Sequence, residues 1–494
     1  MVNEPRGSSN GTPPPLEARG PVPQGAGRFL IGRRQQLENE PNRRWLAEDG
    51  VPGGLATSKL LNLHDRAGRR RLLFINQYYY PDHASTAQHL TDLVESLAAE
   101  GHECHVVCAQ GGYKPGAPRP PAFEIHNGVN IHRVPATSLG RKSTLRRMTD
   151  YLSFYARATA LALRLPRFDT VVTLTTPPII GLVGTLLRRL KGSKHVYWSM
   201  DLHPDASIAL GKMSKRNPAV AWLAWLSDHV YRQADKVVVL GPYMADRILA
   251  KRVRPERVTM IPVWSRKDEI YPMPIDGHPL RLQHGLTDKF VAMYSGNLGL
   301  AHSADEFLEA ARRLKDREDI VFLFVGDGPR MTEVRKAQEA EGLANIRFLD
   351  YFPREQLYAS LSMADVHLIS MRNEMTGIVV PGKLYGVMAS GRPAIFVGPS
   401  HCETADTVRQ SGCGLSIALG DANGLVEALT TLAADPETCR RMSERGLAAF
   451  LANHEREICC GAWTKTITDL LSAPKSVPVP PPRAAMARVA GRPA

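Results

Sequence analysis

The sequence predicts two doubly wound α/β domains that face each other across a cleft, with a tail at each end of the chain. Short apolar runs alternate with amphipathic helical periods along most of its length. Such alternation is typical of a parallel sheet covered by helices on both faces. It stops once, in the polar and proline-rich stretch 264–279, and then restarts. The 494 residues suffice for two domains of this kind.

These patterns divide the chain into five segments. We expect a first domain at 69–263, a second domain at 264–456, and a helix at 457–471 that packs back on the first domain. The flanking segments 1–68 and 472–494 are rich in Pro, Gly and Arg. Such segments cannot bury enough apolar surface to offset the entropy lost on ordering, so we expect disordered tails.

The first domain opens with a buried strand at 72–75 and a helix at 85–100, which Gly101 ends as a left-handed cap. The alternation then continues with a strand at 102–109, a strand at 169–174, a helix at 179–190, a strand at 195–200, a helix at 219–233, a strand at 236–240, a helix at 244–251 and a strand at 258–263.

The second domain repeats the pattern. Its expected elements are a strand at 290–295, a helix at 303–315, a strand at 320–325, a helix at 331–341, a strand at 346–349, a helix at 354–363, a strand at 366–370, a helix at 383–389 and a strand at 394–397. No repeat of 20–50 residues argues for a solenoid.

Charge and cysteine content exclude several classes of protein. The net charge is +13, but residues 1–71 contribute +5 and residues 472–494 contribute +4. A nucleic-acid-binding domain concentrates its excess charge on a folded face, so we expect no nucleic acid. Seven cysteines without a C-x-x-C pair indicate a reduced, cytoplasmic protein. The chain opens without an apolar signal segment, and its longest apolar run, 179–187, falls short of the roughly 20 residues that span a bilayer.

Two glycine turns follow strands of the second domain, where ligands of open parallel sheets bind. The first turn begins with Gly296 and Asn297, and the second reads Gly326, Asp327, Gly328, Pro329 and Arg330. Glycines let backbone amides approach an anion, and Arg330 stands where it could meet a phosphate. For the first turn, a steric need is the commoner explanation of glycines at a strand end. For the second turn, a tight turn with a solvated arginine is an equally good explanation.

A helix start in the second domain is more informative. Pro381, Gly382 and Lys383 precede Leu384 and Tyr385 at the start of the helix expected at 383–389. A cation is unfavourable at a helix N-terminus unless an anion occupies the spot. The alternative is an exposed lysine that turns away from the helix.

The order of these motifs resembles that of the retaining glycosyltransferases of family 4, in particular the branch typified by O-antigen and colanic-acid sugar transferases. The resemblance extends from about Arg71 to Leu471. It rests on the segments NQYYYPDHASTAQHL, YWSMDLHPDASIALG, SGNLG, FVGDGP, NIRFLDYFPREQLYASLSMADVHLIS, PGKLYGVMASGRPAIFVG and SGCGLSI.

The resemblance implies two Rossmann-like domains in the GT-B arrangement. It implies metal-independent transfer of a sugar, with retention, from a UDP- or GDP-sugar to a lipid-linked or oligosaccharide acceptor of cell-surface polysaccharide synthesis. No cofactor is expected. The second domain would bind the donor through the glycine turns, Thr376 and the segment 381–385. Lys383 would neutralise the leaving diphosphate, since no metal does so.

Two departures from the family pattern concern the donor. Where many members carry a pair of glutamates, this chain has Ile378 and Gly386. The hydroxyls of the ribose would then need another acceptor, for which Glu403 is the candidate. Where many members carry Arg and Lys after the first glycine turn, this chain offers only His302.

The acceptor side is expected at the ends of first-domain strands. Asp201, His203 and Asp205 follow the strand at 195–200. Asp201 and His203 could orient an acceptor hydroxyl or take its proton, although a lone histidine is more often packed, and the leaving phosphate could itself act as the base.

The loop after the first strand would also line the acceptor side. It carries Tyr80, and the helix that follows begins with Ser85 and Thr86. The alternative is an aromatic lid without a chemical role.

A basic run suggests contact with an anionic membrane. Residues 140–147 contain Arg141, Lys142, Arg146 and Arg147, and the helix that they open carries apolar side chains on its other face, namely Met148, Leu152 and Tyr155. A solvated basic face is the commoner explanation of such a run.

Two other functions remain open for this sequence. A non-catalytic relative could bind a nucleotide-sugar without turnover, and a nucleotide-sugar epimerase could share the fold. A dehydrogenase is disfavoured, because no G-x-G-x-x-G follows the first strand.

Overall fold

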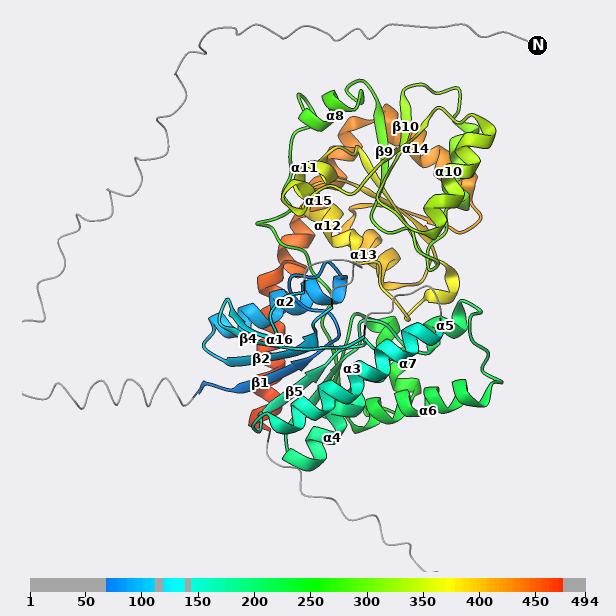
Figure 1. The fold of residues 1–494 in the computed structure, drawn as a ribbon. Coiled ribbons are helices and arrows are strands. Elements are labelled where there is room, and N and C mark those ends of the chain that lie inside the picture. Colours follow the sequence, from blue (N-terminus) through cyan, green and yellow to red (C-terminus); the bar gives the residue numbers. More distant parts are fainter. Residues whose placement is uncertain (1–67, 112–118, 138–143, 474–494) are drawn as a thin grey trace, which may run out of the picture. The chain divides into compact units, whose positions relative to one another are not determined.

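The structure, a computed structural model, describes residues 68–111, 119–137 and 144–473. Within these ranges the chain forms two α/β domains, each built on one largely parallel sheet (Figure 1). The two doubly wound domains are therefore confirmed. The expected disorder of both tails and the basic residues Arg141 and Lys142 fall outside the described residues.

The first domain contains an eight-stranded sheet in the order β3-β4-β2-β1-β5-β6-β7-β8. Only β3 runs antiparallel to its neighbour. The strands are β1 Arg71–Ile75, β2 Glu103–Ala109, β3 Phe123–His126, β4 Val129–Val134, β5 Thr170–Thr173, β6 Lys194–Trp198, β7 Lys236–Val239 and β8 Val258–Met260.

Helices α3 (Thr144–Arg164), α4 (Gly181–Lys191), α6 (Pro218–Gln233) and α7 (Pro242–Ala250) connect strands that are laid down in one direction across this sheet. Right-handed crossovers place such helices on one face, and put α2 (Ser85–Ala99) on the other. A short helix, α5 (Asp205–Ala209), follows β6.

The second domain contains a fully parallel six-stranded sheet in the order β11-β10-β9-β12-β13-β14. The strands are β9 Phe290–Ser295, β10 Ile320–Val325, β11 Ile346–Leu349, β12 Val366–Ser370, β13 Ala394–Gly398 and β14 Gly414–Ala418. The helices are α8 Pro279–Gln283, α9 Asp305–Arg313, α10 Pro329–Glu341, α11 Leu357–Ser362, α12 Lys383–Ala389, α13 Glu403–Ser411, α14 Ala422–Ala434 and α15 Pro436–Asn453.

The last helix, α16 (Arg456–Ser472), returns to the first domain and packs against α2. The Trp463 ring lies 4.7 Å from that of Trp198. The Thr464 hydroxyl donates to the Glu100 carboxylate at 3.0 Å. A single stretch of chain thus ties the end of the second domain to the first.

The sequence did not predict the hairpin of β3 and β4. Its turn is Asn127-Gly128, and both residues adopt positive φ, 47° and 79°. This turn type matches the twist of a two-residue hairpin. The hairpin extends the first sheet at its β2 side and forms the edge of the sheet there.

Candidate functional site

The second sheet has a topological switch point between β9 and β12, because chain connections leave these neighbouring strands in opposite directions. Ligands of open α/β sheets bind outside the carboxyl ends of the strands at such a point. Gly296 and Asn297 follow β9 directly, and Met371 and Arg372 follow β12. The first predicted glycine turn therefore lies at the switch point.

The two glycine turns are in contact with each other. A Cβ at Gly326 would lie 2.7 Å from the carbonyl oxygen of Gly296, and φ at Gly326 is +123°. A Cβ at Gly328 would lie 2.6 Å from Asn297 Oδ1. The N–H of Leu298 donates to the carbonyl of Asp327 at 2.8 Å. The two turns thus approach each other so closely that side chains at Gly326 and Gly328 would clash. Glycines at these positions add no side chains over the ends of the strands.

Lys383 extends over the first turn. Its Nζ lies 3.7 Å from the centre of the Tyr294 ring, donates to the Tyr294 hydroxyl and donates to the Asn297 carbonyl at 3.2 Å. A Cβ at Gly296 would lie 3.2 Å from Lys383 Cε. Burial lowers the pKa of Lys383 well below its usual value of 10.5. Among the described residues, no carboxylate lies within ion-pair distance of this ammonium.

His302 lies beside this cation. Its Nδ1 bonds to the carbonyl of Ser370 at the end of β12. Burial, and then the charge of Lys383, lower the pKa of His302 from 6.5 to about 4. The histidine is therefore neutral at pH 7, and it does not replace the Arg/Lys pair of relatives as a charge.

A cavity of about 270 Å³ opens near the same strand ends. It is lined by Ser303, Asp305, Glu306, Arg330, Arg372, Asn373, Glu374 and Leu419. Arg330 pairs with Glu333 at 2.7 Å, while its buried Nε has no hydrogen-bond partner within the protein. Arg372 was missed from the sequence, although it stands two residues beyond a strand end, which is the same signal that identified Asn297.

The remaining residues of the Lys383 segment are placed less favourably for a ligand. Leu384 and Tyr385 are buried in the core, and the Tyr385 ring packs on His454. Pro381 is also buried, and Gly382, which follows it, is half-buried. Any contact of Leu384 and Tyr385 with a donor would have to come from the backbone.

Gly386 is buried on α12. A Cβ there would meet Ile270 at 3.6 Å, Leu361 at 3.7 Å and Ser265 Oγ at 3.7 Å, which are ordinary van der Waals distances. The assignment of Gly386 to the position of a ribose-binding glutamate stays a prediction.

Glu403, at the start of α13, reaches the first domain. Its Oε1 accepts a 3.0 Å hydrogen bond from the N–H of Met244, and its Oε2 is buried without a partner. A Cβ at Gly241 would lie 2.3 Å from Glu403 Cγ. Burial raises the pKa of this carboxyl. The Oε1 atom of Glu403 thus binds the backbone of the first domain. A contact between Glu403 and ribose stays a prediction.

The first domain brings its own candidates to the same side. Asp201 and His203 follow β6, and burial raises the pKa of Asp201, which the nearby His203 partly opposes. The His203 carbonyl accepts from Ser227 at 2.7 Å. Asp205 instead pairs with Lys251 at 3.1 Å, which gives it a structural role within this domain.

Backbone and side-chain hydrogen bonds join the first domain to residues 376–378 of the second domain. The N–H of Leu202 donates to the carbonyl of Ile378 at 3.0 Å, and Arg247 Nε donates to the carbonyl of Thr376 at 2.7 Å. At Gly377, φ is +66° and a Cβ would lie 2.5 Å from the Tyr243 carbonyl. Thr376 therefore lies at the contact between the domains.

The other predicted acceptor residues lie around the start of α2. The Tyr80 ring stacks on His126 at 4.0 Å. Ser85 is exposed at the first turn of α2, where its carbonyl accepts from His89 at 2.8 Å, and Thr86 is half-buried. Tyr80 is thus held against the β3–β4 hairpin, and the start of α2 is open to solvent.

Three further polar side chains occupy the switch point of the first sheet, between β1 and β5. Asn76 Oδ1, Gln77 Oε1 and Thr175 Oγ1 are buried and have no hydrogen-bond partner within the protein. Buried polar atoms are nearly always paired, so an unpaired group at such a point suggests a ligand. No glycine or charged residue stands next to these three positions, so the sequence pattern did not identify them.

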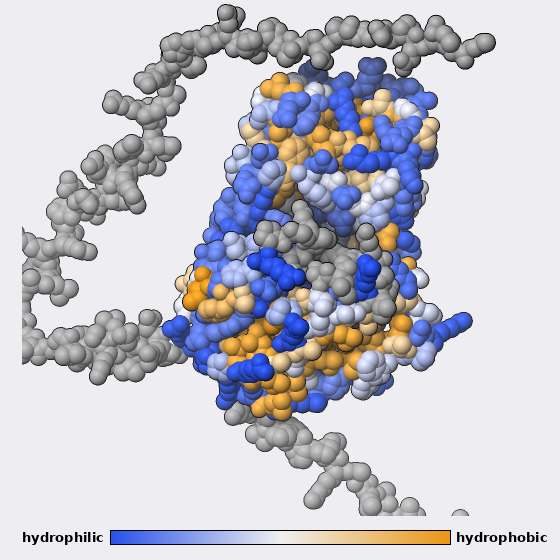
Figure 2. Space-filling model, in the orientation of Figure 1, coloured by the Kyte–Doolittle hydropathy of each residue, from blue (hydrophilic) through white to orange (hydrophobic). Residues whose placement is uncertain are grey.

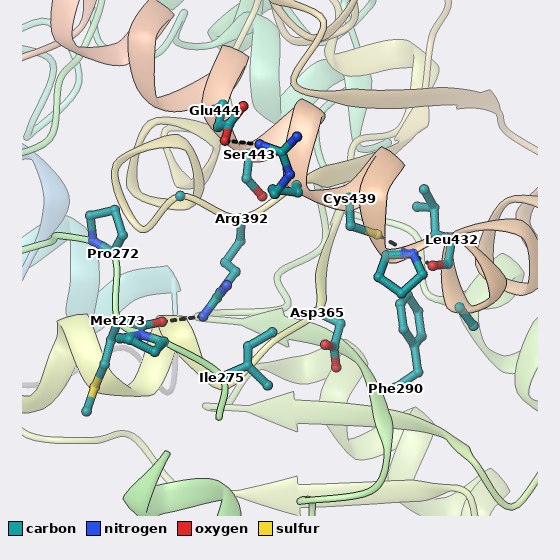
Figure 3. Close-up of a pocket in the computed structure, with 15 residues that line it drawn as sticks. Pro272, Met273, Ile275, Phe290, Asp365, Arg392, Leu432, Cys439, Ser443 and Glu444 are labelled. Carbon is teal, nitrogen blue, oxygen red and sulfur yellow. Dashed lines mark hydrogen bonds and ion pairs between the residues drawn. The ribbon is translucent and has the colours of Figure 1, made fainter. Parts of the chain in front are cut away.

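A larger cavity, about 510 Å³, lies at the opposite edge of the second sheet (Figure 3). Phe290, Asp365 and Arg392 line it, and each stands at the amino end of a strand. Arg392 extends toward the carbonyl of Met273, to which it donates. This cavity is therefore separate from the Lys383 site and lies where ligands of parallel sheets do not normally bind.

No cluster of His, Cys, Asp and Glu among the described residues could hold a metal ion. Likewise, no helix in the described ranges has the length and apolar character needed to cross a bilayer.

Comparison with known proteins supports the reading of both domains. The family model described as "Glycosyl transferase 4-like domain" matches residues 86–264, and the model described as "Glycosyl transferases group 1" matches residues 280–448. The chain belongs to the family 4 glycosyltransferases of the GT-B fold. The two matches fall on the two domains and leave the segment between them, 265–279, as the connection.

Curated relatives are similar along much of this glycosyltransferase. The putative colanic acid biosynthesis glycosyl transferase WcaI of Escherichia coli is 28% identical over 353 residues, which are 67% of this chain and 84% of the relative. The probable glycosyltransferase WbjE of Pseudomonas aeruginosa is 28% identical over 254 residues, 51% of this chain and 63% of the relative.

Solved structures share the fold. Sucrose-phosphate synthase from Thermosynechococcus elongatus has a TM-score of 0.65 at 18% identity, covering 82% of this chain and 100% of that one. Anabaena Alr3699/HepE, solved with UDP-glucose, has a TM-score of 0.62 at 15% identity, covering 81% and 100%. The expected GT-B architecture is thus confirmed.

Proposed function

We propose that this glycosyltransferase moves a sugar, with retention, from a UDP- or GDP-sugar to a lipid-linked or oligosaccharide acceptor in the synthesis of a cell-surface polysaccharide. One observation carries the proposal for the donor. The Lys383 ammonium lies at the switch point of the second sheet, against the Gly296 turn, without a carboxylate partner among the described residues. A half-buried cation in this setting fits an anionic ligand, and a diphosphate has the required charge.

The chemistry needs charge stabilisation on the leaving diphosphate. Negative charge grows on the departing oxygen, so a fixed cation stabilises the transition state more than the bound donor. Lys383 is the candidate for this role, with Arg330 and Arg372 at the neighbouring cavity as further cations. The transfer would proceed without a metal and with no cofactor beyond the substrate.

The first domain would bind the acceptor. Asp201 and His203 are the candidates to orient its hydroxyl, with Tyr80, Ser85, Thr86 and Asp205 lining the acceptor side. Support comes from the Leu202–Ile378 hydrogen bond, which holds the Asp201 loop beside the donor loop. The names of the relatives, which refer to colanic acid in one case, favour a polysaccharide pathway. A lipid-linked acceptor would bring the enzyme to the cytoplasmic face of an anionic membrane.

Incubation of the purified protein with a panel of UDP-, GDP- and ADP-sugars tests the proposal. A donor at a hundredfold excess over its Kd should raise the free energy of unfolding by about 2.7 kcal/mol. The Lys383→Ala variant should lose part of this stabilisation, because the cation acts mainly in the transition state. Lys336→Ala, which removes an exposed lysine from α10, is the matched control and should keep it. Failure of every nucleotide-sugar to stabilise the wild type would contradict the proposal.

Two further measurements address the finer points. NMR of the product should show the anomeric configuration of the donor, and inversion would contradict retention. Transfer should continue in excess EDTA, and loss of activity that Mg²⁺ or Mn²⁺ restores would contradict metal independence.

A further inference from the structure

The outward face of α3 is apolar although it is open to solvent. Met148 is 49% exposed and Leu152 is 61% exposed, and Ala156, Ala160 and Leu163 continue the same stripe at helical spacing. The opposite side of the helix is buried, through Phe154, Ala158 and Ala162. This helix therefore has one apolar side in the core and a second one that nothing in the described chain covers.

Helix α6 exposes two tryptophans. Trp222 is 61% exposed and Trp225 is 55% exposed. The other three tryptophans in the described part of the chain, Trp198, Trp264 and Trp463, are buried. Trp222 and Trp225 stand one helical turn apart, and exposed apolar side chains that form a patch mark an interaction surface.

The two helices belong to one layer. Helix α4 contacts both α3 and α6, and its Leu190 is 64% exposed. We call the surface made by Met148, Leu152, Leu190, Trp222 and Trp225 the α3–α6 face. On the side of the molecule in Figure 2, hydrophobic residues gather on the first domain in the region where Figure 1 draws α3, with hydrophilic residues among them.

The charge of this segment is strongly one-sided. Residues 144–233 contain thirteen Lys and Arg, five Asp and no Glu. None of the five aspartates is exposed: Asp150 is buried, and Asp205 and Asp228 both pair with Lys251. The exposed charges are basic, on Arg146, Arg147, Arg157, Arg164, Arg167, Arg189, Lys212, Lys215 and Arg216.

This distribution also changes the account of the net charge. Residues 72–471 carry only +4, yet the segment 144–233 alone carries +8. Acidic residues elsewhere between 72 and 471 offset this concentration, so the net charge of that range does not reveal it.

We propose that the α3–α6 face docks onto the surface of an anionic lipid bilayer. Tryptophans and aliphatic side chains would enter the interface between headgroups and acyl chains, and the surrounding Arg and Lys would meet anionic headgroups. The face is a spread of separate apolar side chains and not a groove, and every exposed charge in its segment is basic. That combination fits a fluid anionic surface.

Docking stands independently of the proposed chemistry. It adds to the proposed function the place where the enzyme would meet a lipid-linked acceptor. The face includes α6, which the sequence had not associated with a membrane, and it does not require the residues before Thr144 that lie outside the described ranges.

Co-sedimentation of the full chain with vesicles tests docking. We expect binding to vesicles of phosphatidylcholine with 30% phosphatidylglycerol and little binding to phosphatidylcholine alone. The double variant Trp222→Ala/Trp225→Ala should lower the partition coefficient by about tenfold or more. Lys215→Ala/Arg216→Ala should also lower it by roughly tenfold, and the loss should shrink in high salt. Leu282→Ala, which removes an equally exposed residue of α8, is the control and should not change binding.

Fluorescence gives a second readout, because the tryptophans of the face are the exposed ones in the described chain. Trp45→Phe removes the tryptophan that lies outside the described residues. In this background, vesicles with brominated lipid should quench the emission, and the quenching should disappear in Trp222→Phe/Trp225→Phe. These variants should keep transfer to a water-soluble acceptor, which separates a failure of docking from a failure of the proposed function.

Several results would overturn the proposal. One is unchanged partitioning of the double tryptophan variant. Another is equal binding to neutral vesicles. A third is a dimer in solution that hides both tryptophans from aqueous iodide, and a fourth is binding of duplex DNA with the same tryptophan dependence.

Discussion

The backbone N–H of Leu202 donates a 3.0 Å hydrogen bond to the carbonyl of Ile378, which joins the two loops that carry the candidate chemistry. Leu202 stands between Asp201 and His203, and Ile378 precedes Lys383 by five residues. The bond involves backbone atoms only, so it fixes the relation of the loops without using the reactive side chains. Substitution of those side chains can therefore test their roles without removing this contact.

Asp201→Asn is expected to lower kcat by about 10²–10⁴, while stabilisation by the donor is kept. Asparagine has nearly the same shape, but it cannot accept a proton as a carboxylate does. Steady-state kinetics together with thermal shifts measures both quantities. Asp246→Asn, which changes an exposed aspartate of α7, is the control and should leave kcat unchanged. Weaker donor binding with normal turnover in Asp201→Asn would move this residue to the donor side.

Lys383→Met should reduce kcat/KM by roughly 10²–10³, as the loss of a donor to a developing oxyanion does. It should also raise the free energy of unfolding of the ligand-free protein by ~1 kcal/mol, because a half-buried ammonium without a counter-ion is replaced by an apolar side chain. In this variant kcat/KM should thus fall while the free energy of unfolding rises. Lys383→Arg should recover part of the activity, since a planar guanidinium differs from a compact ammonium.

The lowered pKa of Lys383 gives the same residue a pH signature. Below pH 10.5 and above its folded pKa, the unfolded chain holds a proton that the folded protein has lost, so Lys383 adds stability as pH rises through this window. Donor affinity should fall over the same range, because the ammonium is lost.

Near-normal kinetics of Lys383→Met would place the diphosphate elsewhere, with Arg330 and Arg372 the next residues to test.

Thr175→Val should raise the KM for the acceptor by about tenfold while the free energy of unfolding changes little. The Thr175 hydroxyl is buried without a partner, so its replacement by a methyl group removes no hydrogen bond within the protein. Thr173→Val is the matched control two residues earlier, because the Thr173 hydroxyl bonds to His195 at 2.9 Å. That change should cost about 1 kcal/mol of stability and leave the acceptor KM unchanged. The reverse pattern would show that Thr175 has only a structural role.

The sequence predicted the elements that burial and periodicity determine. The strand at 290–295 and the helix starting at Ser85 were predicted at their observed positions, and Gly101 ends that helix with φ of +92°. These elements can be predicted from local sequence patterns, because the spacing of apolar residues determines which side of a helix or strand is buried. The Gly296 turn was found for the same reason, because a strand end marks the ligand side of a parallel sheet.

Residues whose roles depend on distant partners could not be predicted in this way. Glu403 follows a strand, but its direction is set by the approach of Gly241 in the other domain. Gly386 matched a family position by counting, but its neighbours Ile270 and Leu361 are known only from the fold. The exposure of Trp222 also depends on how the helices pack. From the sequence alone, an apolar residue on a helix is expected to be buried, and only the fold shows which side of the helix is left uncovered.

Acid should destabilise this protein, and buried histidines give the reason. Burial lowers the pKa of each of four histidines from 6.5 to between about 3 and about 4, namely His195, His302, His367 and His454. The unfolded chain takes up these protons near pH 6.5, whereas the folded protein resists until about pH 4. The stability that depends on neutral histidines is therefore fully present above pH 6.5 and is lost as pH falls toward 4. Each proton contributes a slope of up to about 1.4 kcal/mol per pH unit.

Two carboxyls act against this trend, because burial raises the pKa of Asp201 and of Glu403. A carboxyl with a raised folded pKa stabilises the folded protein as pH falls, but two such groups oppose four histidines. Urea denaturation between pH 7.5 and 5 should thus show a free energy of unfolding that falls with pH. His367→Gln can keep the hydrogen bond to the Leu361 carbonyl. It should reduce the slope of the free energy of unfolding against pH by the contribution of one proton, which is up to about 1.4 kcal/mol per pH unit. A slope that is flat, or that His367→Gln leaves unchanged, would show that these histidines are not held neutral by the fold.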